Sequence, residues 1–157
     1  VDAGQGNIKV RFLDATKPYQ IDFRVMQSGK PQTLNVQKVN STEKYLIGTY
    51  DIEILTTPRI YVTTNVEQSN TTNINIKAPG FLKYTSGNLI TGQIFSQNDN
   101  GSWDWIANFD PNTKSGNQQL QPGAYKIVYR QLNLKKSEYT LEKEFRINSN
   151  KTTSVQL

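Results

Sequence analysis

Apolar and polar residues alternate along most of this chain. In the first half, Ile21, Phe23 and Val25 are separated by polar residues, and Tyr50 and Ile52 follow the same pattern. A period of two residues places alternate side chains on opposite faces of a β-strand, so each segment predicts a strand with one buried face. Further alternating segments contain Leu34 and Val36; Ile74 and Ile76; Leu82 and Tyr84; Trp103, Trp105, Ala107 and Phe109; Tyr125, Ile127 and Tyr129; Tyr139, Leu141, Phe145 and Ile147; Val155 and Leu157.

Turn residues separate these segments. The stretches "SGKP" from Ser28, "NDNG" from Asn98, "SNTT" from Ser69 and "SNKTT" from Ser149 are rich in Gly, Asn and Ser. These residues favour tight turns between strands. No stretch has a helical period, so the chain predicts an all-β fold of short, hairpin-linked strands.

Three segments recur in the same order in the two halves. Gly48-Thr49-Tyr50-Asp51-Ile52 matches Gly123-Ala124-Tyr125-Lys126-Ile127 at an offset of 75 residues. "VEQSNTTNINI" matches "INSNKTTSVQL" at an offset of 81, and "GNIKV" matches "GFLKY" at an offset of 74. The recurrence predicts an internal duplication, with two tandem small antiparallel β-sandwiches of the transthyretin-like or immunoglobulin-like kind at residues 1–78 and 79–157.

The repeated Gly-x-Tyr also has a structural interpretation. A glycine permits a sharp entry of the backbone into a strand. The tyrosine after it can bury its ring while its hydroxyl reaches nearby backbone, as in a tyrosine corner. We therefore expect Tyr50 and Tyr125 to be core residues.

Composition narrows the possible functions. The chain of 157 residues has no histidine and no cysteine, and so lacks the usual general base, thiolate nucleophiles and the commonest metal ligands. Asp51 and Glu53 lie two residues apart on a predicted strand, but on its outward face. We expect a protein that is not an enzyme and that needs no cofactor.

Charge and hydropathy exclude two kinds of partner. The net charge is +5, with both signs interspersed along the chain, whereas a nucleic-acid binder usually concentrates Lys and Arg. No apolar run reaches membrane-spanning length, so we expect no membrane insertion within this segment. The sequence opens at Val1 and not at Met, which we interpret as a segment of a longer protein.

The segment "GSWDWIANFD" raises the strongest ligand hypothesis. Trp103 and Trp105 are predicted to share one face of a strand, with Asp104 between them. Aromatic rings on a sheet can stack against sugar rings, so these three residues are a candidate polysaccharide site.

A packing role competes with this hypothesis. Ala107 and Phe109 continue the face of the two tryptophans, and the matching strand of the first copy carries Leu34 and Val36, which we interpret as core residues. We therefore favour burial of the tryptophans and keep the ligand site as the alternative.

A calcium site is a weaker hypothesis. Asp99 lies in the predicted turn and Asp110 follows the tryptophan strand. Because Ca²⁺ takes six to eight oxygen ligands, two carboxylates on separate loops fall short unless carbonyl oxygens complete the shell. We expect ordinary turns and no metal at these positions.

Taken with "TTNINIKAPGFL", the phrases "YLIGTYDIEILTTPRI" and "LQPGAYKIVYR" resemble bacterial repeats found downstream of a von Willebrand factor type A domain in exported proteins. Those repeats are similar to transthyretin-like and carboxypeptidase-regulatory-like sandwiches, in which a "pGxYxI" strand entry and a terminal "TTxxxV" strand recur. The resemblance implies an exported, modular and non-catalytic segment. The Asp-x-Ser-x-Ser run of the type A domain is absent, so no functional residue carries over.

Together these features predict a non-catalytic spacer or protein-interaction segment of a larger surface-associated bacterial protein. The expected location is extracytoplasmic, and the expected partner is another protein or a neighbouring domain of the same chain. The alternative is a carbohydrate-binding module that uses the strand of Trp103 and Trp105.

Overall fold

The computed structural model describes residues 4–110, 113–134 and 139–157, so the interpretation based on Val1 lies outside the described residues. In these ranges the regular structure is β-strand, as the alternation predicts. No helix in the described ranges has the length and apolar character needed to cross a membrane. The chain divides into two compact units, Val1–Ala78 and Pro79–Leu157, which are described separately below.

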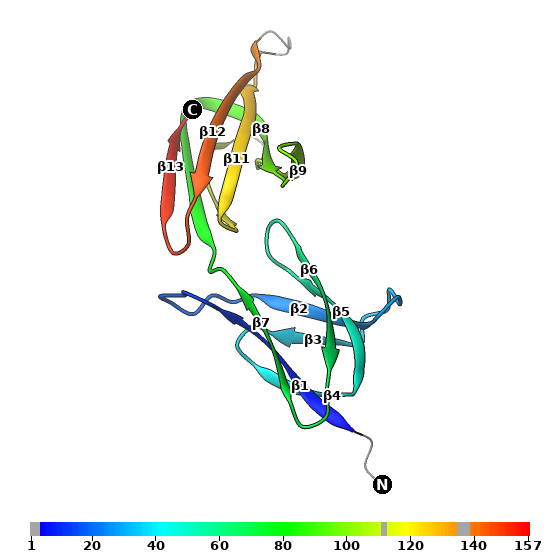
Figure 1. Cartoon of the computed structure of the whole chain (residues 1–157). Helices are drawn as coiled ribbons and strands as arrows, with labels where there is room; N and C mark the ends of the chain where they lie inside the picture. The colour runs from blue at the N-terminus through cyan, green and yellow to red at the C-terminus, as the bar shows by residue number, and fades with distance from the viewer. Residues whose placement is uncertain (1–3, 111–112, 135–138) are drawn as a thin grey trace. The chain divides into compact units, whose positions relative to one another are not determined.

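The first unit consists of two sheets that share one core. One sheet has the strand order β4-β1-β7 and the other β3-β2-β5-β6 (Figure 1). The two apolar faces meet where Ile8 of β1, Val25 of β2 and Ile52 of β5 are buried. The strands are β1 (Gln5–Phe12), β2 (Asp22–Gln27), β3 (Asn35–Lys38), β4 (Thr42–Leu46), β5 (Gly48–Ile54), β6 (Ile60–Val66) and β7 (Thr71–Ile76).

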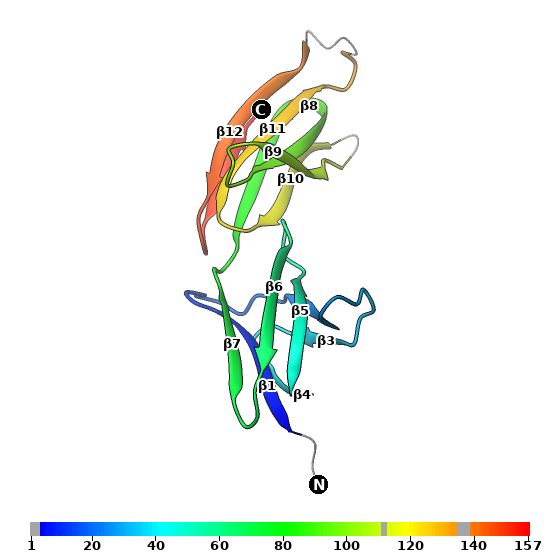
Figure 2. The ribbon, with the colours of Figure 1, turned by 45° about the vertical axis from the view of Figure 1, so that its right-hand side comes forward.

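In the second unit, one long strand takes part in both layers. The first part of β8 pairs with β13 (Figure 1) and with β10, and its second part pairs with β9 and β11 (Figure 2). Leu82 and Tyr84 from the first part share a buried cluster with Ile94 from the second. The strands are β8 (Gly80–Gln97), β9 (Trp103–Asn108), β10 (Thr113–Leu120), β11 (Gly123–Gln131), β12 (Leu141–Ile147) and β13 (Thr152–Gln156).

The prediction of purely antiparallel sheets is wrong at one place in each unit. β1 pairs with β7 in parallel, and β8 pairs with β13 in parallel (Figure 1). The other strand pairs of the described chain are antiparallel. The alternation of apolar residues reports which face is buried but carries no information on strand direction, so the parallel pairs could not be predicted from it.

The two Gly-x-Tyr segments have the predicted structure. Tyr50 and Tyr125 are 4% and 2% exposed, and each hydroxyl donates a hydrogen bond to the backbone carbonyl four residues earlier, that of Leu46 at 2.6 Å and of Gln121 at 2.5 Å. Gly48 and Gly123 have φ values of 156° and 155°. Burial raises the pKa of Tyr125 above its ordinary value. The prediction that the ring is buried and the hydroxyl reaches nearby backbone is confirmed in both segments.

The predicted core role of Leu34 and Val36 is wrong. Their side chains are 56% and 54% exposed, whereas Gln37 is 1% exposed. The amide of Gln37 is fully engaged: it donates to the carbonyl oxygens of Ile8 at 2.8 Å and Ser41 at 2.9 Å, and accepts from the hydroxyl of Tyr45 at 2.8 Å. Because these hydrogen bonds compensate burial of the polar group, β3 turns its polar side toward the core.

Candidate functional site

A β-bulge in β9 decides where the two tryptophans point. In the pairing with β8, Trp103 lies opposite Gln97 and Trp105 opposite Phe95, but Ala107 lies opposite Ile94, so the register shifts by one residue in between. Ile94 faces the core, and Phe95 therefore faces outward. The bulge thus leaves both tryptophans on the outer side of the sheet, while Ala107 faces the core.

The predicted common face of Trp103, Trp105, Ala107 and Phe109 is therefore wrong. Phe109 is buried and its ring stacks on that of Tyr84, with centroids 4.2 Å apart. Trp105, in contrast, is 55% exposed, which contradicts the favoured packing role for this residue. The tryptophans belong to the outer side of the sheet β9-β8-β11-β12, which we call the outer face.

Trp103 is held by a cation on the outer face. The ammonium of Lys126 on β11 lies 4.9 Å from the centroid of the Trp103 ring and 5.7 Å from that of Phe95. It also lies 3.6 Å from a carboxylate oxygen of Glu142 on β12. Cation–π contacts of this kind favour a fixed ring position. Trp103 is half-buried.

Trp105 is the more accessible ring, and the candidate residue Asp104 does not join it. The indole Nε1 of Trp105 donates to the Oδ1 atom of Asn108 at 3.0 Å. Asp104 points away from the tryptophans by strand alternation, and its Oδ2 atom accepts a hydrogen bond from the Nδ2 atom of Asn98 at 3.2 Å. The structure thus places the two tryptophans on one face of β9, whereas Asp104, which lies between them in the strand, bonds to a residue of the preceding turn.

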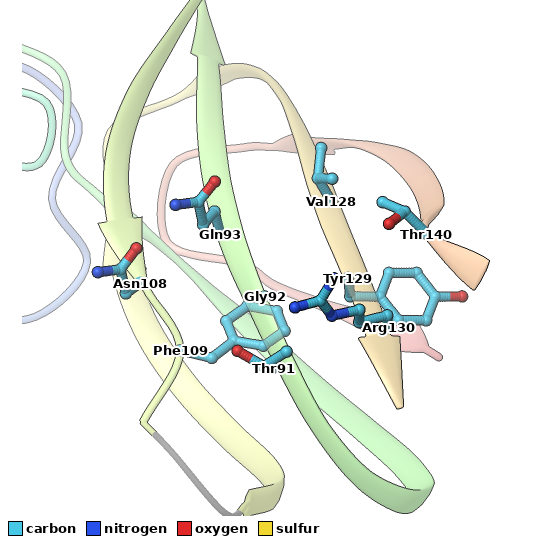
Figure 3. A pocket seen from close by; sticks show the side chains of 9 residues that line it. All are labelled: Thr91, Gly92, Gln93, Asn108, Phe109, Val128, Tyr129, Arg130 and Thr140. Carbon is cyan, nitrogen blue, oxygen red and sulfur yellow. The ribbon is translucent and has the colours of Figure 1, made fainter. Parts of the chain in front are cut away.

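A shallow, open hollow of about 550 Å³ continues along the same sheet. Figure 3 shows the side chains around it, which come from β8, β9 and the residue after it, β11, and the residue before β12. Gln93 lies opposite Asn108 on one side and Val128 on the other, so the three share the outer face. The lining residues are Thr91, Gly92, Gln93, Asn108, Phe109, Val128, Tyr129, Arg130 and Thr140.

The outer face therefore combines exposed and half-buried aromatic rings with amide and guanidinium groups. Such a surface can stack against a flat ligand and form hydrogen bonds beside it. Phe95, Lys126 and Asn108 were not among the site residues predicted from the sequence. Lys126 was detectable in principle, because it lies between the alternating Tyr125 and Ile127. Phe95 adjoins the apolar Ile94, so the sequence does not show which of the two faces outward, and the direction of Asn108 depends on the bulge.

The two candidate calcium ligands lie at opposite ends of β9. Asp99 is in the turn before the strand and Asp110 follows it, and both are exposed. A strand of six residues spans about 20 Å. Within the ranges that the structure describes, no three acidic residues come together as metal ligands.

The two carboxylates Asp51 and Glu53 on β5 are engaged in hydrogen bonds. Glu53 forms an ion pair with Arg24 at 2.6 Å and accepts from the Tyr61 hydroxyl at 3.0 Å. Asp51 accepts from the backbone N–H of Gly29 at 3.0 Å and from the hydroxyl of Thr63 at 2.8 Å. These hydrogen bonds lower the pKa of both carboxyl groups. Such ionised, engaged carboxylates are poorly suited to act as general acids near neutral pH.

The chain has no match among family models and none among the curated proteins. Similar solved structures include the Bacillus anthracis TIE protein, at 16% identity and a TM-score of 0.34, and the match covers 98% of this chain and 34% of that one. The chain thus spans about a third of that protein's length.

Two pilins are similar as well. The minor pilin of Streptococcus agalactiae has 14% identity and a TM-score of 0.41, over 97% of this chain and 94% of that one. The shaft pilin spaA of Lactobacillus rhamnosus GG has 9% identity and a TM-score of 0.34, over 98% and 96%. Structural similarity at these TM-scores gives no information about the function of this chain.

Proposed function

We propose that this chain is a non-catalytic spacer segment of a larger exported, surface-associated bacterial protein. The observation that carries the proposal is the parallel pairing of the first and last strands in each unit, β1 with β7 and β8 with β13. Parallel strands run in one direction, so the chain enters a unit at one end of the pair and leaves at the other. A paired length of six residues separates entry from exit by about 20 Å.

The second part of the proposal is that residues 1–78 and 79–157 are transthyretin-like or immunoglobulin-like β-sandwich domains related by duplication. Equivalent turns support it. Ser69 and Asn150 precede the last strand of their units with φ values of 62° and 63°. Thr72 and Thr153, which are 81 positions apart, each donate a 2.8 Å hydrogen bond to a backbone carbonyl seven residues earlier.

Two further observations favour a non-catalytic role outside the cytoplasm. The chain has no histidine or cysteine, and the paired carboxylates Asp51 and Glu53 are engaged in hydrogen bonds. The extracytoplasmic location rests on the resemblance of the sequence to repeats of exported bacterial proteins. The partner in this proposal is a neighbouring domain of the same chain, which the segment holds away from its point of attachment.

Surface display tests the spacer role. The chain is placed between a cell-surface anchor and an epitope tag, and antibody binding to the tag is measured. We expect more binding than when the tag is joined directly to the anchor, because folded units hold the tag away from the surface. Equal binding in the two cases would overturn the proposal.

A carbohydrate-binding role for the outer face is the second candidate function. The bulge that turns both tryptophans outward favours it, because the 55% exposed ring of Trp105 offers a flat apolar surface beside the amide of Asn108. Stacking of a sugar ring on an indole is a common mode of recognition at such a surface.

Tryptophan fluorescence tests this second candidate. Both tryptophans of the chain lie on the outer face, so a bound polysaccharide is expected to change their emission. Trp105→Ala should abolish the response, and Tyr61→Ala, which removes a 71% exposed ring of the first unit, should leave it unchanged. A panel of polysaccharides that leaves the emission constant would eliminate this candidate.

A further inference from the structure

The relative direction of the first and last strands determines how each unit responds to a pulling force. Force on a spacer acts through the chain, at the start of the first strand and the end of the last. In a parallel pair these two points lie at opposite ends, so the force slides one strand along the other and loads the ladder hydrogen bonds together. A pair pulled from the same end would instead open one hydrogen bond at a time.

We propose that β1–β7 and β8–β13 are force-bearing clamps that resist unfolding when the chain is stretched. The proposal rests on the spacer role, because only a segment under tension needs such a clamp. It adds a second function, the transmission of mechanical load, to that of holding a partner at a distance.

In the first unit, hydrogen bonds extend the clamp beyond its ladder at both ends. The ladder pairs six residues, from Asn7 opposite Thr71 to Phe12 opposite Ile76. The N–H of Asn7 donates to Asn70 O at 2.8 Å at one end, and that of Leu13 donates to Ile76 O at 2.9 Å at the other.

A side-chain bond crosses the same pair of strands. Arg11 Nε donates to Asn75 Oδ1 at 2.7 Å, between two residues that lie directly opposite in the register. This bond is oriented across the direction of sliding, so it is loaded together with the ladder.

The second unit repeats this arrangement with different residues. Five residues pair, from Phe81 opposite Thr152 to Thr85 opposite Gln156. The N–H of Phe81 donates to Lys151 O at 2.9 Å, and the Thr85 hydroxyl donates to Gln156 Oε1 at 2.8 Å. A cross-strand side-chain hydrogen bond near the end of the pair is therefore present in both units, although the residue types that form it differ.

A glycine lets the turn before the last strand approach the start of the first. A Cβ atom on Gly6 would lie 2.2 Å from the carbonyl oxygen of Glu67 and 2.9 Å from that of Asn70. On Gly80 it would lie 2.2 Å from the oxygen of Asn148 and 2.9 Å from that of Lys151. Only glycine fits at this distance, and it allows the turn to close against the clamp.

Single-molecule pulling in two directions tests the clamp in the full chain. The chain has no cysteine, so cysteine pairs provide specific attachment points. The variant Gln5→Cys/Lys77→Cys applies force at opposite ends of the β1–β7 pair, whereas Gln5→Cys/Asn70→Cys applies it at one end. The two variants load the same hydrogen bonds in the same unit, and only the direction of force differs.

We expect the unfolding force at opposite ends to be several-fold higher than at one end, because forced unfolding depends on the unfolding barrier along the pulled direction. Matching thermal midpoints for the two variants show that neither attachment has disturbed the fold. Equal forces in the two directions, or a lower force at opposite ends, would overturn the clamp. The display experiment is independent of this outcome, because a spacer without a clamp still holds its tag away from the surface.

Discussion

Removing the hydroxyl of Tyr125 gives a sensitive measurement of the core of the second unit. The group donates its hydrogen bond to Gln121 O in a buried environment, and the ring packs on Phe145 with centroids 5.6 Å apart. In Tyr125→Phe the ring remains, but the carbonyl oxygen loses its donor, which costs about 1–3 kcal/mol. For a domain of this size the loss corresponds to a decrease of roughly 5–20 °C in the melting temperature.

The larger change, Tyr125→Ala, also removes the ring. A buried aromatic residue replaced by alanine costs about 3–5 kcal/mol, because a cavity remains. Units of this size have a total stability of roughly 4–12 kcal/mol. We therefore expect Tyr125→Ala to remove a large part of the stability of the second unit, and Tyr125→Phe to remove a smaller part and leave the unit folded.

Tryptophan fluorescence isolates this effect from the rest of the chain. Both tryptophans lie in the second unit, so the thermal transition in their emission reports that unit alone. Tyr50→Phe makes the same change in the first unit and serves as the matched control, since it should lower the first unit's transition in circular dichroism and leave the tryptophan transition unchanged. If Tyr125→Phe left the tryptophan midpoint unaltered, the role given to this hydroxyl would be refuted.

Three further predictions concern the backbone, a buried amide and a carboxylate. Gly80→Ala should destabilise the second unit by about 1–3 kcal/mol in thermal melts, because its Cβ would overlap a carbonyl oxygen, whereas Gly87→Ala has open space and should melt like the wild type. Gln37→Leu should lower the free energy of unfolding of the first unit by about 1–3 kcal/mol in urea, because the three hydrogen bonds of a buried amide are lost, and unchanged stability would contradict this role. The hydrogen-bonded ion pair with Arg24 holds the pKa of Glu53 below its ordinary value of 4.5. The ion pair therefore stabilises the first unit fully above pH 4.5, and this stabilisation is lost as the pH falls through the lower pKa of the folded state. Between about pH 7 and about pH 3, Glu53→Gln should therefore weaken the acid sensitivity of the first unit, and an identical pH profile would exclude this contribution.

The faces of many strands could be predicted from local sequence. In β2, β5 and β11, residues such as Phe23, Ile52 and Ile127 are buried, as their alternation indicates. The recurring Gly-x-Tyr also predicted two buried tyrosines, Tyr50 and Tyr125. These features depend on residues a few positions apart, whose side-chain directions follow from the strand period alone.

Three features required the tertiary structure. The bulge in β9 depends on pairing with β8, and it moves Trp105 from the predicted core face to the outer face. The polar side of β3 faces inward because Gln37 finds partners on β1 and β4, which no local pattern reveals.

The parallel direction of the first and last strands is the third feature, and the proposed spacer and clamp roles depend on it. By itself, the sequence determined that the chain forms one-side-buried strands and that its halves resemble each other. Strand partners, direction and register were decided only by the tertiary structure, because they depend on contacts between residues far apart in the chain.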